Sequence, residues 1–180
     1  MRELRLPDGT PVRVRPMVHG DRLWLAEAVE RLTPESRYLR FLSPLRTLDE
    51  TMLVRLVDSV DGVNHVAVVA TLSPGEPEAQ RGSVARYIRL PMEPQVAELA
   101  ITVTDALQGR GLGSLVGRWL ADHALGNDIT TFAATIASDN TGSIKIMTRL
   151  GEIVRKEHPS PGVLELRVLL ADGSPRERCF

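Results

Sequence analysis

The sequence predicts an α/β (α+β) fold in which a mixed, mostly antiparallel central sheet is flanked by helices. Strand-like segments dominate the first half, with a hairpin over residues 4–15 and strands at 64–72 and 82–90. From residue 96 onward, strand and helix alternate twice before a closing pair of strands. Early strands followed by this alternation give a sheet that mixes antiparallel and parallel neighbours.

Helices are expected at three places before residue 60. Residues 21–32 carry apolar side chains at helical spacing, and a further helix spans 48–57 with a possible extension to 60. Between them, Thr33 supplies an N-cap and Pro34 the first position of a helix that runs to Leu42. The arginines of this region fit an exposed helical face or a docking surface for an acidic partner: Arg31, Arg37, Arg40 and Arg46.

The second half is organised around one strand–loop–helix unit. A buried strand over 96–103 leads into a glycine-rich loop and then a helix that begins near Leu112. A second helix ends at Gly151, a residue that suits the C′ position of a helix. The other expected segments are a turn at 73–77, a loop at 91–94, a strand at 130–138, that second helix at 142–150, and closing strands at 153–156 and 163–170.

Composition sets bounds on the class of protein. The 180 residues fit one domain over 1–171 with a flexible polar tail at 172–180, and the net charge of −1 gives no bulk attraction to nucleic acid or membranes. No segment resembles a signal peptide or a membrane span, so a cytoplasmic monomer or homodimer is expected. The single cysteine, Cys179, excludes an internal disulfide, and the four histidines share no metal-ligand spacing, so no metal is expected.

The glycine-rich loop predicts an anion-binding site. Glycines between a strand and a helix expose backbone N–H groups, the helix N-terminus adds a positive dipole, and Arg110 adds a full charge. A pyrophosphate is the simplest ligand for such a loop. The candidate binding residues are Gln108, Gly109, Arg110, Gly111, Leu112, Gly113 and Ser114.

The spacing of this loop separates it from two other phosphate-binding motifs. No lysine follows the glycines as in a P-loop, and the third glycine of a dinucleotide-binding motif is replaced by Ser114. The pattern Gln108-x-x-Gly111-x-Gly113, after an Ala-Glu-Leu-Ala-Ile-Thr-Val strand, resembles the GCN5-related N-acetyltransferase (GNAT) superfamily. The resemblance covers about residues 96–151 and implies that the loop holds the pyrophosphate of coenzyme A.

The resemblance also implies how acetyl-CoA is held beyond its pyrophosphate. In GNAT proteins the strand before the loop splays from its parallel neighbour, here 130–138, and its free backbone groups bind pantetheine. Ile101, Thr102 and Val103 are the matching positions, and Asn140 matches an asparagine that contacts pantetheine. Helix capping is an equally good explanation of Asn140.

Glu98 is the candidate catalytic residue. An acceptor ammonium is mostly protonated at neutral pH, and a carboxylate in an apolar strand can accept its proton as a general base. GNAT enzymes often carry a glutamate at this place, and Glu93 in the adjoining loop is the second candidate. A salt bridge or a solvent-facing position is the alternative explanation of Glu98.

One position departs from the family pattern. Many GNAT enzymes have a tyrosine four residues before the glycine that ends the second helix, and this tyrosine protonates the leaving thiolate. Met147 stands there and cannot donate a proton. Pat-type bacterial protein lysine acetyltransferases also lack the tyrosine, and the run from Pro34 to Phe41, together with Ala85-Arg86-Tyr87, is similar to theirs.

These resemblances imply a function and leave two alternatives open. The first hypothesis is acetyl transfer from acetyl-CoA to a protein lysine, with AMP-forming acyl-CoA synthetases as the implied substrates and Glu98 as the base. The second keeps the fold and changes the acceptor to a small-molecule amine. The third is a coenzyme A-binding regulatory module without turnover, which the absent tyrosine favours and Glu98 opposes.

Overall fold

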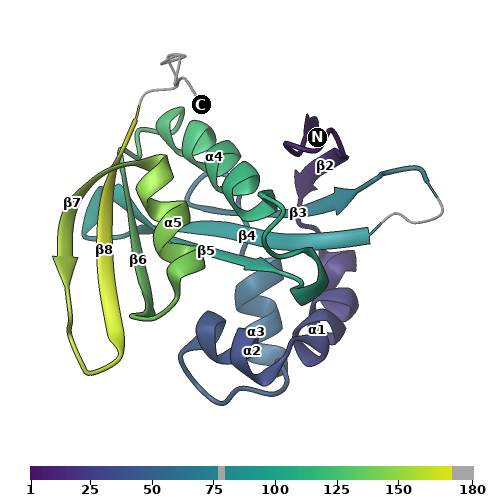
Figure 1. Ribbon diagram of the computed structural model, residues 1–180, viewed down its shortest axis with the longest axis horizontal. Helices are drawn as coiled ribbons and strands as arrows, with labels where there is room; N and C mark the ends of the chain where they lie inside the picture. The colour runs from purple at the N-terminus through teal and green to yellow at the C-terminus, as the bar shows by residue number, and fades with distance from the viewer. Residues whose placement is uncertain (77–79, 172–180) are drawn as a thin grey trace.

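The computed structural model describes residues 1–76 and 80–171, and within these residues eight strands form one sheet. The strand order is β1-β2-β3-β4-β5-β6-β8-β7, and β5 and β6 are its one parallel pair (Figure 1). The mixed, mostly antiparallel sheet expected from the sequence is therefore confirmed. The strands are β1 (Arg2–Arg5), β2 (Pro11–Pro16), β3 (His65–Leu72), β4 (Gln80–Leu90), β5 (Glu93–Val103), β6 (Thr131–Ala137), β7 (Gly151–Glu157) and β8 (Val163–Leu170).

The helices agree with the sequence expectations except near residue 50. The Thr33 side chain accepts a hydrogen bond from the Ser36 N–H at 3.2 Å, which confirms it as an N-cap. The single helix expected over 48–57 is instead a short α-helix that continues as one π-helical segment. The helical segments are η1 (His19–Asp21), α1 (Arg22–Arg31), α2 (Pro34–Phe41), α3 (Glu50–Leu53), η2 (Val54–Asp58), η3 (Asp105–Leu107), α4 (Leu112–Leu125) and α5 (Thr141–Leu150).

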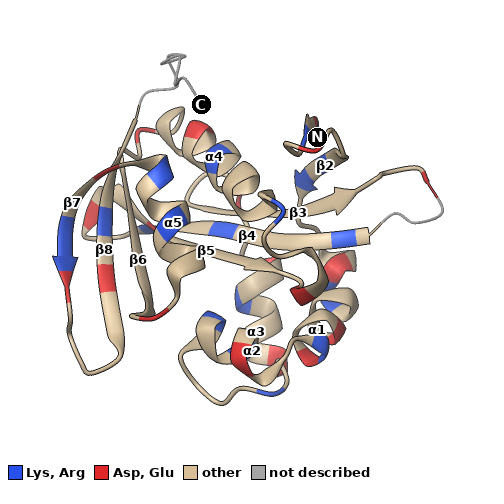
Figure 2. Ribbon diagram, in the orientation of Figure 1, with Lys and Arg blue, Asp and Glu red and all other residues tan. Residues whose placement is uncertain are grey.

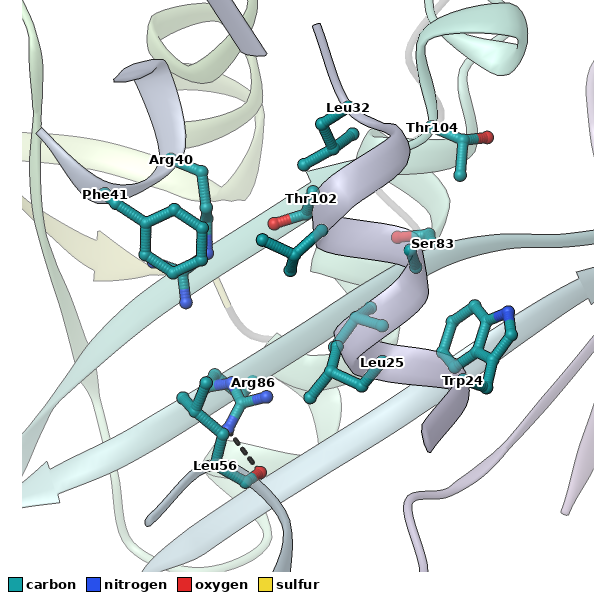
Figure 3. Close-up of a pocket in the computed structure, with 13 residues that line it drawn as sticks. Trp24, Leu25, Leu32, Arg40, Phe41, Leu56, Ser83, Arg86, Thr102 and Thr104 are labelled. Carbon is teal, nitrogen blue, oxygen red and sulfur yellow. Dashed lines mark hydrogen bonds between the residues drawn. The ribbon is translucent and has the colours of Figure 1, made fainter. Parts of the chain in front are cut away.

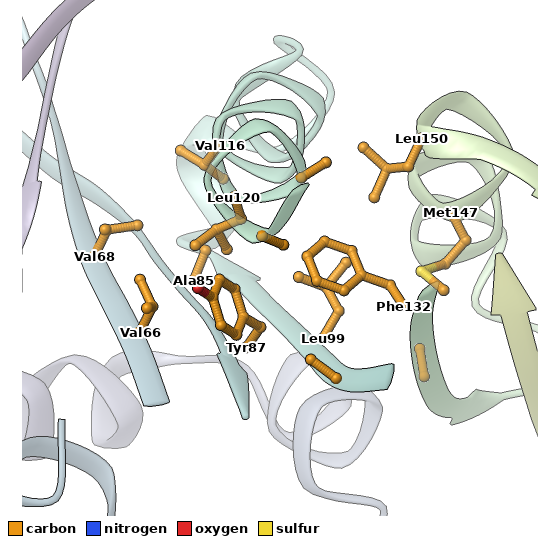
Figure 4. Close-up of a cluster of buried hydrophobic side chains, with 14 of the residues drawn as sticks. Val66, Val68, Ala85, Tyr87, Leu99, Val116, Leu120, Phe132, Met147 and Leu150 are labelled. Carbon is orange, nitrogen blue, oxygen red and sulfur yellow. The ribbon is translucent and has the colours of Figure 1, made fainter. Parts of the chain in front are cut away.

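Helices cover both faces of the sheet. Helices α4 and α5 pack on one face, and α1, α2 and α3 with η2 lie on the other (Figure 1). Under α4 and α5 the core is apolar and closely packed, with Leu120, Phe132 and Met147 at 2% exposure or less (Figure 4). Figure 2 shows that acidic and basic residues occur together on the outer strands β7 and β8, whereas β3 in the middle carries none.

The parallel pair β5 and β6 stays together for only a short distance. Their pairing runs from Val96–Thr131 to Glu98–Ala133, and the two strands then diverge (Figure 1). On its other side β5 continues to pair with β4 as far as Val103. In the described structure, the edge of β5 that faces β6 after Glu98 therefore carries backbone groups with no strand partner.

Two local expectations are wrong. The loop expected at 91–94 is shorter, because β5 already begins at Glu93. Gly151 does not adopt the left-handed C′ conformation but is extended and begins β7. A Cβ at this position would collide with the carbonyl oxygen of Leu169 on β8, so glycine is required for the close approach of two strands.

Residues 172–180, which the sequence predicts as a flexible tail, lie outside the described residues, and so does part of the expected turn at 73–77. Within 1–76 and 80–171, no helix has both the length and the apolar composition that crossing a bilayer requires.

Candidate active site

The glycine-rich loop connects β5 to the N-terminus of α4. Gly109 and Gly111 adopt φ values of +76° and +88°, which side-chain-bearing residues rarely adopt. Gly111 is the N-cap of α4, and no side chain caps the helix there. The first N–H groups of α4 are therefore left to bind a ligand, and together with the helix dipole they suit a pyrophosphate.

Two glycines in the first half of α4 allow close packing against α5 and β5. A Cβ at Gly113 would lie 2.8 Å from Cδ1 of Ile146, and a Cβ at Gly117 would lie 3.1 Å from Cδ1 of Ile101. Leu112 is 1% exposed, so its contribution to the loop is its backbone N–H. The Ser114 hydroxyl accepts a hydrogen bond from Arg149 of α5 at 3.1 Å.

Arg110 is held by the first hairpin of the chain. Its Nη2 donates to Asp8 at 2.8 Å and to Thr10 at 3.1 Å. Hydrogen bonds from Arg110 and Thr10 hold the pKa of the Asp8 carboxyl well below its usual range. An anion on the loop would therefore meet an arginine that already has a carboxylate partner.

The loop is also connected to helix α2 through Asp105. Its carboxylate accepts from the Thr33 N–H at 3.0 Å, from the Ser36 hydroxyl, and from Gln108 Nε2 at 3.2 Å. Gln108 donates in addition to the Val103 carbonyl at 3.2 Å. Gln108, which the sequence predicts as a ligand-binding residue, therefore has a structural role: its side-chain hydrogen bonds connect the end of β5, the loop and α2.

The free edge of β5 presents the segment that the sequence predicts for pantetheine. Ile101 and Val103 direct their side chains to the core under α4, whereas Thr102 lies on the opposite face. The unpaired backbone of these three residues starts directly after Glu98, the last β5 residue paired with β6. The structure thus brings the glycine-rich loop, this edge and Glu98 together along one strand.

Glu98 is exposed, so the solvent-facing position given as the alternative is found and the apolar environment expected for a base is wrong. It shares the α2-side face of β5 with Thr102, as the strand alternation predicts, and it attracts the Arg40 guanidinium of α2 electrostatically. Glu93 does not serve as a second candidate. Its carboxylate pairs with Arg167, at 2.8 Å to Nη2, and this pairing lowers its pKa and makes it a weaker base.

Two residues of α5 have clear structural roles. Asn140 Oδ1 accepts a hydrogen bond from the Ser143 N–H at 2.9 Å, so the capping role expected for it is confirmed. Met147 is 2% exposed and belongs to the core beside Phe132 (Figure 4). Met147 therefore neither donates a proton nor faces the free edge of β5.

The sequence did not predict a pocket between α1, α2 and the sheet. This cavity of about 40 Å³ has an apolar wall from α1 and two guanidinium groups, Arg40 from α2 and Arg86 from β4 (Figure 3). Arg40 was expected on an exposed face but is partly buried here, so that expectation is wrong for this residue. The available signal was Arg86, because it is the one charged residue in the segment 84–88 of β4.

Arg86 is 4% exposed, and its hydrogen bonds go to neutral groups. Nη1 donates to the Leu56 carbonyl at 2.6 Å and lies 3.4 Å from His65 Nε2, while Nη2 lies 4.0 Å from Met17 Sδ. Burial, with a smaller contribution from the charge of Arg40, lowers the pKa of Arg86 to about 9. Burial and then the charge of Arg86 lower the pKa of His65, so this imidazole is neutral at pH 7.

Comparison with known families identifies the class of protein. The sequence profile of the acetyltransferase (GNAT) domain family matches residues 12–152. The chain belongs to this family and is an acyltransferase, as the glycine-rich loop and the diverging strands indicate. Within the family it is close to the Pat-type proteins, and the resemblance inferred from the sequence is confirmed.

Two curated proteins illustrate this similarity. The acetyltransferase PA5475 of Pseudomonas aeruginosa is 28% identical over 152 residues, which cover 84% of this chain and 80% of that protein. The acetyltransferase Pat of Mycolicibacterium smegmatis is 32% identical over 170 residues, which cover 91% of this chain and 48% of that protein. This chain therefore spans about half the length of Pat.

Solved structures show the same relationship. The GNAT domain of S. lividans PAT superposes with a TM-score of 0.81 at 29% identity, covering 94% of this chain and 96% of that one. The yncA protein of Salmonella typhimurium, solved with its cofactor acetyl-CoA, gives a TM-score of 0.67 at 15% identity. The superposition covers 93% of this chain and 99% of the yncA chain, and at 15% identity it shows a shared fold only.

Proposed function

We propose that this protein transfers an acetyl group from acetyl-CoA to the side-chain amine of a protein lysine, with Glu98 as the general base. The observation that carries the proposal is the position of Glu98. It is the last β5 residue paired with β6, and it adjoins the free strand edge that leads to the glycine-rich loop. A carboxylate and an acyl-donor site thus meet at the point where the parallel strands separate.

The acyl donor fits the site that the chain provides. The uncapped N-terminus of α4 and the left-handed Gly109 and Gly111 suit a pyrophosphate, and Arg110 adds a positive charge. The unpaired backbone from Ile101 to Val103 offers hydrogen bonds to the amide groups of pantetheine. Acetyl-CoA is therefore the proposed co-substrate, and the proposed domain extends over residues 1–171.

The proposed reaction is direct attack. Glu98 takes a proton from the acceptor ammonium, directly or through water, and the neutral amine attacks the thioester carbonyl. A backbone N–H on the free edge of β5 stabilises the oxyanion of the tetrahedral intermediate. The nitrogen then releases its remaining extra proton to water as the C–S bond breaks, and the coenzyme A thiolate takes a proton from water, because Met147 is buried and has no proton to give.

The exposure of Glu98 favours a protein acceptor over an enclosed small amine. Its carboxylate is open to solvent, so a lysine on the surface of a large partner has room to reach it. The pocket next to it carries arginines, and a basic pocket does not attract a cationic amine. The proposed substrates are cytoplasmic AMP-forming acyl-CoA synthetases, which the Pat-type resemblance implies.

The test uses peptide mass spectrometry of a bacterial acetyl-CoA synthetase incubated with acetyl-CoA and this protein. One acetylated active-site lysine is expected. The Glu98→Gln variant should acetylate it about 10²–10⁴-fold more slowly, while its affinity for acetyl-CoA, measured by calorimetry, stays unchanged. Glu93→Gln is the matched control on the same strand, and it should keep the wild-type rate.

Each other outcome changes the proposal in a defined way. Equal rates for the Glu98→Gln variant and the wild type would overturn the assignment of the base. No modification above the enzyme-free background would overturn the protein substrate, and thiol release would then be measured across a panel of small amines. Binding of acetyl-CoA without thiol release for any acceptor would overturn catalysis itself.

A further inference from the structure

We propose that Arg40 and Arg86 form a subsite that binds a carboxylate carried by one of the two reactants. The inference rests on the proposed transferase function, because the subsite lies on the Glu98 side of β5. The carboxylate has two possible sources: the free end of a dicarboxylic acyl group on coenzyme A, or a carboxylate on the acceptor near its amine. Both sources present the same chemistry to the pocket.

The first argument is the lack of a carboxylate partner for two arginines in one pocket. Within the described residues, no acidic side chain forms an ion pair with either guanidinium, and the Cζ of Arg40 lies over the Phe41 ring, 4.8 Å from its centroid. Arg86 donates to the Leu56 carbonyl and has longer contacts to His65 Nε2 and Met17 Sδ, and none of these three acceptors carries a negative charge. Buried charges are normally paired, and a bound carboxylate would supply the missing acceptors.

The second argument is the shape and lining of the pocket. Figure 3 shows Arg40 from α2 and Arg86 from β4 at the same end of the pocket, with Leu25 and Trp24 of α1 further along. The buried Ser83 hydroxyl also lines it, and among the described residues this oxygen has no hydrogen-bond partner. A volume of about 40 Å³ is larger than one water requires and suits a small group such as a carboxylate.

The third argument is the position of the pocket relative to the reacting groups. Thr102 lines it from β5, and its neighbours Ile101 and Val103 belong to the free edge proposed for pantetheine. Arg40 lines the pocket and is attracted electrostatically to Glu98, and Glu98 shares the α2-side face of β5 with Thr102, so the pocket and the proposed base lie on the same side of the sheet. A short chain that ends in a carboxylate can therefore reach the arginines from the reacting centre.

The test compares matched reactants in two arms. The donor arm measures kcat/KM for succinyl-CoA and butyryl-CoA, which differ in a terminal carboxylate, with one lysine peptide as acceptor. The acceptor arm uses acetyl-CoA with ω-amino acids of increasing length and alkylamines of equal length. If the carboxylate belongs to the acyl donor, kcat/KM for succinyl-CoA should exceed that for butyryl-CoA by about tenfold or more. If it belongs to the acceptor, kcat/KM for the ω-amino acids should exceed that for the alkylamines by the same factor.

Arginine variants decide whether this preference belongs to the subsite. Arg40→Met should lower the ratio of the two kcat/KM values toward one, whereas Arg46→Gln, which removes a charge nearby outside the pocket, should leave the ratio unchanged. Arg86→Lys is the second variant, because it keeps a charge but loses the forked geometry. Arg86 also holds the Leu56 carbonyl, so Arg40→Met decides the question if the Arg86 variant does not fold.

A binding measurement separates failure of the subsite from failure of the proposed function. Succinate should raise the melting temperature of the wild type more than the neutral succinamide does, and Arg40→Met should abolish the difference. Stabilisation by succinate without any acyl transfer would keep the subsite and overturn the function. Acyl transfer with no carboxylate preference, or with a preference that Arg40→Met retains, would overturn the subsite.

Discussion

The two faces of the sheet are covered in different ways. Under α4 and α5 the interior is continuous and apolar, and Val116, Leu120 and Phe132 have no exposed surface. Under α1, α2 and α3 the apolar cluster is smaller, and a cavity with two arginines interrupts it. The face with α4 thus supports the acyl-donor site from a rigid core, whereas the opposite face leaves space beside Glu98.

In the proposed function, the face under α4 and α5 supports the acyl-donor site and the opposite face holds the reacting groups. The glycine-rich loop acts mainly through backbone groups, so it requires a helix that is held firmly in place. The proposed subsite would act through side chains, and in the described structure its buried Ser83 hydroxyl has no hydrogen-bond partner and its arginines have no carboxylate partner. Space and unsatisfied hydrogen-bonding groups on one face are what a reactant-binding site needs.

A Leu→Ala substitution is expected to lower the free energy of unfolding by different amounts on the two faces, and this is the largest predicted effect on stability. Leu120→Ala should lower the free energy of unfolding by about 3–5 kcal/mol, because Leu120 is fully buried under α4 and its removal leaves a cavity. Leu25→Ala should lower it by about 2 kcal/mol, because Leu25 already borders an open cavity and loses fewer contacts. Urea unfolding measures both values, and equal losses would show that the two faces are packed alike.

A smaller effect is expected where the two faces are joined. Asp105→Asn replaces the acceptor of hydrogen bonds from Thr33, Ser36 and Gln108 with a neutral amide. We expect a loss of about 2 kcal/mol in the free energy of unfolding, together with weaker acetyl-CoA binding in calorimetry. Asp58→Asn, on the α1 side, is the control and should leave acetyl-CoA binding unchanged. If acetyl-CoA binding also stayed unchanged in Asp105→Asn, the loop would not depend on α2.

The pH dependence of Asp105 has a defined sign. Burial alone would raise its pKa, but the hydrogen bonds from Ser36 and Thr33 outweigh this effect, and the pKa in the folded protein is lowered. Its contribution to stability is therefore present above the unfolded pKa of 3.8 and is lost as the pH falls from there through the folded pKa. Asp105→Asn should reduce the acid-induced loss of stability below pH 4, measured by unfolding at several pH values.

The sequence predicted the α4 face well because local patterns determine it. The Gln108-x-x-Gly111-x-Gly113 motif, the apolar spacing of α4 and the N-cap of α5 at Asn140 involve residues close together in the chain. The pocket was not predicted because Arg40 and Arg86 are separated by 46 positions and meet only after α2 packs on the sheet. The sequence left open whether Glu98 faces solvent, because its exposure depends on how other elements pack around β5.

Adding one methyl group to the glycine-rich loop tests whether acetyl-CoA binding depends on the left-handed backbone conformation of the loop. Gly111→Ala forces a side chain into a left-handed conformation at φ +88°, with its Cβ 3.3 Å from Cδ of Pro7. This should cost about 1 kcal/mol, seen as loss of stability or of acetyl-CoA affinity in calorimetry. Gly142→Ala, at the start of α5, is the control: its φ is not left-handed, and its Cβ would lie at the ordinary van der Waals distance of 3.5 Å from Asn140 Oδ1, so no comparable cost is expected.

The smallest expected effect concerns the competition between Asp8 and an anionic ligand for Arg110. Their ion pair is exposed, and such pairs contribute about 0–1 kcal/mol. Asp8→Ala removes the competing carboxylate, so acetyl-CoA affinity should rise about two- to threefold, and the rise should shrink as the salt concentration increases. Glu3→Ala removes a carboxylate from another ion pair on the same hairpin and is the matched control. A fall in affinity for Asp8→Ala would show instead that Asp8 orients Arg110 toward the ligand, and the hairpin would then be part of the donor site.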